Sequence, residues 1–311
     1  MIVTVTLNLA LDVTYEVGEV TWHAANRVSA VAHRAGGKGV NVARVLHAIG
    51  HDVLVTGLVG GPTGEAVRSD LAAAGLADAL VPIAGETRRT LAVVDGAQGD
   101  ATGFWEAGPT VTATEWARLL EAYRGLLDDA DAVVLSGSLP PGAPADAYAV
   151  LCGLAAEAGV PAFLDADGEA LRLGLAGRPA LVKPNRDELT RATHHSDPVE
   201  AAEALRAEGA EAVVVSLGAE GLLAVTAEGR WRAAPPSRVA GNPTGAGDAA
   251  VAALAAALVA GHGWPDRLEQ AVALSAAAVG APLAGSFDGP AYRRHLGAVR
   301  AEPVSGSPSP T

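Results

Sequence analysis

Cysteine, lysine, asparagine and aromatic residues are all scarce in this 311-residue chain. Its single cysteine, Cys152, cannot form an internal disulfide bond. No uninterrupted run reaches the roughly 20 strongly apolar residues that a membrane-spanning helix requires. No basic leader with a cleavage site precedes the strand-like run that starts at Ile2. We therefore expect no signal peptide, no membrane partner and a cytoplasmic location.

Basic residues are also outnumbered by acidic ones. The chain has 22 Lys and Arg against 35 Asp and Glu, which gives a net charge of −13. Such an acidic protein repels the phosphates of nucleic acids and of anionic lipids, so neither is an expected partner. The hydrophobic fraction of 50% is high enough for a large core, which excludes disorder as the main state.

The few lysines and asparagines are informative because they are rare. Only Lys38 and Lys183 are lysines, and every other basic residue is an arginine. A compact ammonium group on a flexible stem differs chemically from a guanidinium fork, so we expect roles at these positions that arginine cannot fill. The alternative is a coding bias that left them there by chance. Asparagine occurs only at positions 8, 26, 41, 185 and 242.

Short β-branched runs alternate with longer segments of helical period, which predicts an α/β fold with a mostly parallel sheet covered by helices on both faces. The expected main strands are 2–7, 52–58, 132–136, 162–165, 180–183, 212–216 and 221–226. The expected helices are 39–49, 64–74, 113–127, 145–158, 187–192, 198–208, 246–260 and 267–279.

Four other segments alternate apolar and polar residues, as strands with one face in water do. They are 12–20, 28–34, 90–94 and 101–106. We interpret them as a small second sheet, a lid over the carboxyl edge of the main strands, where open α/β sheets bind ligands. We expect one domain over 1–302, with lid strands from about 12–34 and 88–107, and a disordered Pro- and Ser-rich tail over 303–311.

Two glycine-rich segments open helices. In Gly-Gly-Lys-Gly-Val-Asn at 36–41, glycines let backbone N–H groups approach an anion, but Gly39 stands where a Walker A loop needs Ser or Thr. In Asn-Pro-Thr-Gly-Ala-Gly-Asp at 242–248, glycines leave N–H groups free at a helix N-terminus, with Asp248 in its first turn. The second segment predicts an anion hole with a base beside it, although an acid there is also favoured simply as a helix-start residue.

Polar residues also follow several of the expected strands. Asp12 can bond the hydroxyls of a polyol, and one of two adjacent arginines, Arg88 or Arg89, can face the cleft and hold a phosphate. Asn185 and Glu188 can share one face toward a hydrated cation. The loop at 135–142 can line a cleft, and the turn at 216–221 can hold a nucleotide or be an ordinary hairpin.

Together these segments resemble the ribokinase-like, or PfkB, family of carbohydrate kinases, from about Thr4 to Gly285. Segments 36–41 and 244–248 are similar to the two signature regions of the family, with Lys-Pro-Asn-x-x-Glu at 183–188 and Ser-Leu-Gly-x-x-Gly at 216–221 between them. The resemblance implies a three-layer α/β/α sandwich with a central, mostly parallel sheet and a small β-sheet lid. Segments 6–12, 87–88 and 136–142 look most like the branch that contains 1-phosphofructokinase and tagatose-6-phosphate kinase.

The resemblance also implies transfer of the γ-phosphoryl group of ATP, with Mg²⁺, to a hydroxyl of a sugar phosphate. Asp248 would be the base, and the N–H groups of Gly245, Ala246 and Gly247 would hold the transferring phosphate. The implied sugar-phosphate ligands are Asp12, Gly37, Lys38, Asn41, Arg88 and Ser138. The implied ATP ligands are Lys183, Asn185, Ser216, Gly218 and Gly221, while Asn185 and Glu188 would orient the water shell of Mg²⁺.

Three positions depart from the branch. Relatives usually have Pro at the position of Leu9, often have Asn near that of Thr90, and have Ser at that of Ala249. None of these differences removes a charged catalytic group. We expect fructose 1-phosphate as the acceptor, with tagatose 6-phosphate and fructose 6-phosphate as alternatives. Unphosphorylated sugars and nucleosides are the least favoured acceptors. A dinucleotide-dependent dehydrogenase would need Gly-x-Gly-x-x-Gly after the first strand, and 8–12 contains no glycine. The apolar face of the lid strands predicts a homodimer through the lid.

Overall fold

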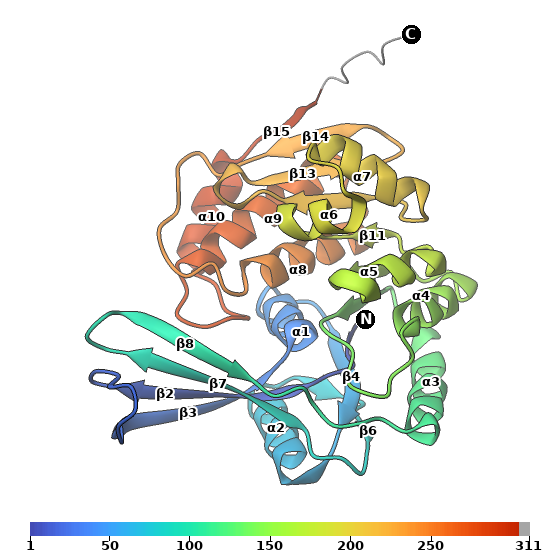
Figure 1. The fold of residues 1–311 in the computed structure, drawn as a ribbon. Helices are drawn as coiled ribbons and strands as arrows, with labels where there is room; N and C mark the ends of the chain where they lie inside the picture. The colour runs from blue at the N-terminus through green and yellow to red at the C-terminus, as the bar shows by residue number, and fades with distance from the viewer. Residues whose placement is uncertain (305–311) are drawn as a thin grey trace.

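Two β-sheets of different character organise residues 1–304, the part of the chain that the computed structural model describes (Figure 1). The larger, eleven-stranded sheet has the order β15-β14-β13-β12-β11-β10-β9-β1-β4-β5, with β6 also paired to β4. Its strands are β1 (Ile2–Thr6), β4 (Val53–Val59), β5 (Ala77–Asp78), β6 (Val81–Pro82), β9 (Ala132–Ser136), β10 (Ala162–Asp165), β11 (Leu181–Val182), β12 (Val213–Ser216), β13 (Leu222–Val225), β14 (Arg230–Ala233) and β15 (Ala301–Pro303).

Helices cover both faces of this sheet, which confirms the expected three-layer architecture. Along β1, Ile2 belongs to one hydrophobic cluster and Val3 to the other, because successive side chains of a strand point to opposite faces. One face carries α1 (Lys38–Ala48), α2 (Gly61–Ala73), α8 (Ala246–Val259) and α9 (Trp264–Val279), with α10 (Gly289–Ala298) against α9. The other carries α3 (Ala113–Leu127), α4 (Ala147–Glu157), α5 (Gly168–Gly174), α6 (Arg186–Thr193) and α7 (Pro198–Ala207), with the short turn η1 (Leu175–Gly177). A second short turn, η2 (Gly218–Glu220), connects β12 to β13.

The lid sheet has the order β3-β2-β7-β8 and projects from the main body (Figure 1). Its strands are β2 (Ala10–Val17), β3 (Val28–Gly36), β7 (Arg88–Asp95) and β8 (Asp100–Trp105). Asp12 lies opposite Arg34 and Thr90, whereas the next residue, Val13, lies opposite His33 and Leu91. The pleat therefore gives the lid one polar face, on the side of Asp12, and one apolar face, on the side of Val13.

Several elements were not expected from the sequence. The helices α5 and α10 and the strands β14 and β15 are short, and their apolar residues are too few to give a clear period. Pro303 of β15 pairs with Trp231 of β14, and the N–H of Val304 donates to the carbonyl of Arg230 at 2.9 Å, so placing these two residues in a disordered tail is wrong. The rest of that tail, 305–311, lies outside the described residues. No helix in residues 1–304 is long and apolar enough to cross a bilayer.

Candidate active site

A cavity of about 1140 Å³ opens at the carboxyl ends of the main strands, with residues of the lid on one side. Ligands bind at this edge in open α/β sheets, and the volume exceeds the roughly 300–1,000 Å³ of a typical single-ligand site. Every residue that the sequence assigns to the site lines it, although these residues come from distant parts of the chain. They are Asp12, Gly37, Lys38, Asn41, Arg88, Ser138, Lys183, Asn185, Glu188, Ser216, Gly218, Gly221, Gly245, Ala246, Gly247 and Asp248.

The expected anion hole precedes α8 in a tight turn. The N–H of Ala246 donates to the carbonyl of Pro243 at 3.1 Å, and Gly245, with φ 85° and ψ −7°, occupies the third position of what is a type II turn. That position needs a positive φ, which glycine adopts without strain. No residue within 1–304 accepts a hydrogen bond from the N–H of Gly247. The hole therefore has fewer free donors than the three expected, because the turn itself uses that of Ala246.

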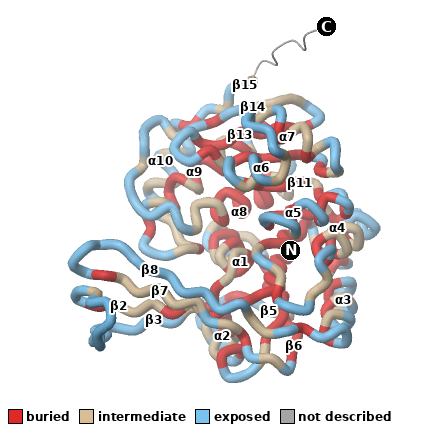
Figure 2. Tube along the Cα trace, viewed as in Figure 1, coloured by how far each residue is buried: buried red, intermediate tan, exposed pale blue. Residues whose placement is uncertain are grey.

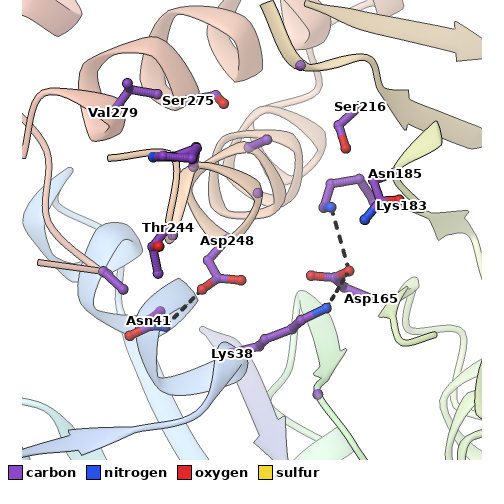
Figure 3. Close-up of a pocket in the computed structure, with 18 of the residues that line it drawn as sticks. Lys38, Asn41, Asp165, Lys183, Asn185, Ser216, Thr244, Asp248, Ser275 and Val279 are labelled. Atoms are coloured by element: carbon purple, nitrogen blue, oxygen red, sulfur yellow. Dashed lines mark hydrogen bonds and ion pairs between the residues drawn. The ribbon is translucent and has the colours of Figure 1, made fainter. Parts of the chain in front are cut away.

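Asp248 lies in the first turn of α8 with only 7% of its surface exposed. The side-chain amide of Asn41 donates to its carboxylate at 2.8 Å, as Figure 3 shows. Burial, and then the negative charge of Asp165, raise the pKa of Asp248 to about 7, against the opposing effects of Asn41 and the two lysines. A carboxyl group with this pKa can accept a proton near neutral pH. Asn41, expected to bind sugar, thus also holds this carboxylate.

Both lysines of the chain approach one buried carboxylate that was not singled out from the sequence. The Nζ atoms of Lys38 and Lys183 lie 3.4 and 3.6 Å from Oδ1 of Asp165, which is 2% exposed (Figure 3). Burial lowers the pKa of Lys38, but Asp165, followed by Asp248 and Glu188, outweighs it, so the pKa is raised and the ammonium stays charged. An acid at the end of a central strand, followed by Ala-Asp-Gly, is the signal that could have identified Asp165.

One end of the cavity, which we expect to hold the sugar phosphate and call the sugar end, contains charged side chains that hydrogen bonds hold in place. The hydroxyl of Thr90 donates to Asp12, whose pKa burial raises, with Thr90 and Arg88 opposing. The Nε of Arg88 donates to the carbonyl of Asn8 at 3.1 Å and its Nη1 to that of Glu106 at 3.2 Å. These bonds fix the position of the Arg88 guanidinium. Arg89, on the opposite face of the lid, pairs with Glu106.

Glycine brings the backbone of the first signature segment close to these groups. A Cβ atom on Gly36 would fall 2.1 Å from Oδ2 of Asp12, and one on Gly37 would fall 2.7 Å from the methyl carbon of Thr6. A larger residue at position 36 would displace the carboxylate of Asp12, and one at position 37 would displace Thr6. On the other side, the amide of Asn8 donates to the hydroxyl of Ser138 at 3.2 Å, so the loop at 135–142 is tied to the end of β1.

Asn185 and Glu188 form a reciprocal cap at the start of α6. The side chain of Asn185 accepts from the N–H of Glu188 at 2.8 Å, and the carboxylate of Glu188 accepts from the N–H of Asn185 at 2.8 Å. No group of three or more acidic, His or Cys side chains in residues 1–304 could enclose a metal ion. This donor set fits Mg²⁺ that is held mainly by nucleotide phosphates and water, with one carboxylate beside it.

The part of the cavity that we expect to hold ATP, called the nucleotide end, includes a face of α9 that was not expected from the sequence. Val272, Ser275, Ala276 and Val279 line the cavity at spacings of three and four residues, which put them on one side of the helix. The spacing was visible in the sequence, but Ala and Val at helical period are typical of any core helix, so they did not indicate a ligand.

Comparisons with known proteins agree with this geometry. The model of the pfkB family carbohydrate kinases matches residues 6–289. Phosphofructokinase-2 from Escherichia coli superimposes with a TM-score of 0.88 at 29% identity, covering 95% of this chain and 98% of that one. It has also been solved with fructose 6-phosphate and in a tetrameric inhibited form. A Thermotoga maritima protein described as a possible 1-phosphofructokinase superimposes with a TM-score of 0.86 at 28% identity, covering 98% and 99%.

The family match spans both glycine-rich segments and all the charged residues that surround the cavity. The fold of the two solved relatives includes both the large sheet and the smaller one at nearly full coverage. The chain belongs to the pfkB family of carbohydrate kinases and is a sugar kinase, a phosphotransferase.

Proposed function

We propose that the protein transfers the γ-phosphoryl group of ATP to a ketohexose phosphate, with fructose 1-phosphate as the preferred acceptor and fructose 1,6-bisphosphate as the product. The observation that carries the proposal is the position of Asp248. It lies between the turn at the start of α8 and the charged sugar end, and it bonds to Asn41 of the first signature segment. A base at this point can touch an acceptor hydroxyl while the transferring phosphate lies against the turn.

The chain's own groups suit each part of the reaction. The carboxylate of Asp248 takes the proton of the acceptor hydroxyl. The hydroxyl oxygen then bonds to the γ-phosphorus of ATP as the bond from that phosphorus to the leaving oxygen of ADP breaks. The N–H of Gly247 and the ammonium of Lys183, whose Nζ would lie 3.3 Å from a Cβ on Gly247, stabilise the negative charge on the transferring group. Mg²⁺, bound to the nucleotide near Glu188, would neutralise further phosphate charge.

Two cations at the sugar end favour a substrate that already carries a phosphate. The guanidinium of Arg88 lies in the cavity wall with two of its N–H groups directed to main-chain carbonyls, which leaves its remaining donors for a phosphate. Lys38, held by Asp165, supplies the second positive charge. Tagatose 6-phosphate and fructose 6-phosphate present the same phosphate chemistry and are the alternatives. An unphosphorylated sugar or a nucleoside would leave Arg88 without an anion.

A substrate panel tests this proposal directly. ADP release is measured in a coupled assay with fructose 1-phosphate, fructose 6-phosphate, tagatose 6-phosphate, ribose and a nucleoside. We expect kcat/KM to be highest for fructose 1-phosphate and lower by roughly 10³-fold or more for the unphosphorylated acceptors, because those leave buried polar groups unpaired. A higher kcat/KM for ribose or the nucleoside than for all three phosphates would contradict the proposal. A preference for one of the other two phosphates would replace fructose 1-phosphate by that sugar.

We further propose that the lid pairs with the lid of a second copy. Val28, Val31, Phe104 and Trp105 of the lid strands are among the exposed large apolar residues of the described chain. The outer lid strands β3 and β8 are mostly exposed, whereas β2 and β7 between them are mostly intermediate or buried (Figure 2). The register places Val31 and Phe104 on the apolar face, in line with the buried Val13. Sedimentation should give a dimer that Phe104→Asp dissociates, and a wild-type monomer at micromolar concentration would refute this pairing.

A further inference from the structure

A second cavity, of about 360 Å³, lies next to the active site and takes no part in the proposed reaction. Its polar lining comes from Arg34 at the base of the lid, Arg44 and His47 on α1, and Ser286 in the loop before α10. Leu76 and Phe287 add apolar walls. Neighbouring residues of one loop reach both cavities, because Ala284 lines the first and Gly285 and Ser286 line the second.

The positive charge in this cavity exceeds the negative charge that balances it. Arg44 is bound by the carboxylate of Asp70, and its side chain is only 9% exposed. Its Nε is buried and has no hydrogen-bond partner among residues 1–304. Arg34 contacts no carboxylate within that part of the chain; its Nη1 donates to the carbonyl of Ala284 at 2.9 Å. Of the two guanidinium groups, only that of Arg44 is in contact with a carboxylate, whereas Asp70 and Asp12 act on Arg34 from a longer distance.

Burial and the nearby charge of Arg44 both affect the pKa of Arg34. Burial lowers its pKa, and the charge of Arg44 lowers it further, against the opposing effects of Asp70 and Asp12. In a chain with a net charge of −13, two arginines that face one cavity and repel each other are a local exception. A bound anion would remove that repulsion and use the donors that remain.

We propose that this second cavity binds a small phosphate-bearing anion, either free phosphate or a small phosphate monoester. Arg34 and Arg44 provide donors for the oxygens, Ser286, whose hydroxyl donates to the carbonyl of Leu283, lines the wall, and His47 lies at the exposed rim. The volume of 360 Å³ holds a phosphate with a short carbon chain but is far smaller than the active site.

The position of the second cavity links it to the two parts that the reaction uses. A Cβ on Gly245 would fall 2.8 Å from the Cα of Ala284, so the anion-hole turn packs directly against this loop. A Cβ on Gly285 would fall 3.0 Å from the Cα of Asn41, whose side chain bonds to Asp248. Arg34 connects the same loop to lid strand β3. An anion on Arg34 therefore contacts the junction between the lid and the catalytic turn.

The test measures binding without any reliance on catalysis. The ring resonance of His47 in isotope-labelled protein is assigned by its loss in His47→Gln, and inorganic phosphate is then titrated at constant pH and ionic strength. We expect a saturable shift, an affinity lower by about tenfold or more in Arg34→Gln, and an unchanged affinity in Arg294→Ala, an exposed arginine of α10 outside the cavity. Arg34→Gln keeps N–H donors for Ala284, so its unfolding curve should match that of the wild type.

Several results would overturn the proposal. They are a resonance that does not move, a shift that chloride at equal ionic strength reproduces, and equal phosphate affinity in the wild type and Arg34→Gln. A second titration with glycerol 3-phosphate identifies the source of the anion: tighter binding than phosphate supports a metabolite ester, and weaker binding supports free phosphate. Hydrogen exchange over 282–287 should slow on phosphate addition in the wild type but not in Arg34→Gln. These readouts stay informative even when no sugar phosphate proves to be a substrate.

Discussion

The two ends of the active-site cavity are built in different ways. At the sugar end, side chains carry the chemistry: Asp12 is held by Thr90, and Arg88 is directed by two main-chain carbonyls. At the nucleotide end, glycines of the turn at 216–221 and small residues on one face of α9 form the wall. Charged side chains select a particular anion, whereas backbone groups and small apolar residues select a shape. We therefore expect substitutions at the two ends to change different kinetic constants.

Asp248 lies where the two ends meet, so its loss should cause the largest effect. Asp248→Asn preserves the size of the side chain and can keep a hydrogen bond to Asn41, but an amide cannot accept the proton of the acceptor. We expect kcat to fall roughly 10² to 10⁴-fold, with the KM of both substrates nearly unchanged. Steady-state kinetics with each substrate varied in turn measures this.

A matched control is Asp167→Asn, another carboxylate that lines the cavity but is exposed to solvent. It should change kcat by no more than about threefold, because an exposed carboxylate contributes little field at the reacting atoms. Turnover in Asp248→Asn within tenfold of the wild type would remove Asp248 from the role of base. An equal loss in Asp167→Asn would show that the cavity depends on total charge and not on one positioned group.

The next largest effect should be confined to the sugar end. Arg88→Ala removes the guanidinium that faces the cavity, and we expect the KM for a phosphorylated sugar to rise roughly 10- to 100-fold with the KM for ATP unchanged. Arg89→Ala is the control, because Arg89 lies on the other face of the lid, 60% exposed and paired with Glu106. Similar losses on phosphorylated and unphosphorylated sugars would mean that Arg88 does not read the phosphate.

The contrast between the two ends also determines how much the sequence could predict. At the sugar end, rare and charged residues stand out, so Lys38, Asp12 and Arg88 were identified and do line one cavity. Asp165 was missed because a single aspartate after a strand has many ordinary functions, and only the folded chain brings both lysines to it. At the nucleotide end, Val272 and Val279 carry no signal that distinguishes a ligand wall from a core.

The fold likewise has segments that the sequence predicts well and segments that it does not. The central strands β9 and β10 were predicted to the residue, because each is a buried β-branched or apolar run between clear helices. The edge strand β15 was not, because its three residues include a proline and pair only at the rim of the sheet. The free N–H groups before α8 were also overestimated, since a turn type depends on backbone angles that composition alone does not specify.

The pH dependence should be a smaller effect centred on the junction. A base must be unprotonated to act, and the pKa of Asp248 is about 7 because burial and Asp165 disfavour its charge. We expect kcat/KM to be level above pH 8 and to fall about tenfold per pH unit below pH 6. A rate that stays constant down to pH 5 would contradict the raised pKa. The sugar-end variant Arg88→Ala should retain the profile, because Arg88 is not among the groups that shift this pKa.

Stability should change with pH in the opposite direction. The pKa of Asp248 rises from 3.8 in the unfolded chain to about 7 in the folded one, so between these values the folded state binds more protons. The free energy of unfolding contributed by this residue therefore decreases as pH rises from 4 to 7. Asp248→Asn should be as stable as the wild type near pH 4 and more stable at pH 8, by at most about 4 kcal/mol, in urea unfolding. A less stable variant at pH 8 would refute the cost of this buried charge.

The smallest effect should come from the nucleotide end. Val279→Ala removes two methyl groups from a partly exposed residue in the α9 wall of the cavity, which costs about 1 kcal/mol of apolar contact at most. We expect the KM for ATP to rise roughly two- to fivefold while the KM for the sugar phosphate and kcat stay constant. Val259→Ala, at the end of α8 and outside the cavity, controls for a general loss of packing. The difference in construction predicts that the two ends are separable. A change in sugar-phosphate KM as large as that in ATP KM would show instead that they are coupled through the helices.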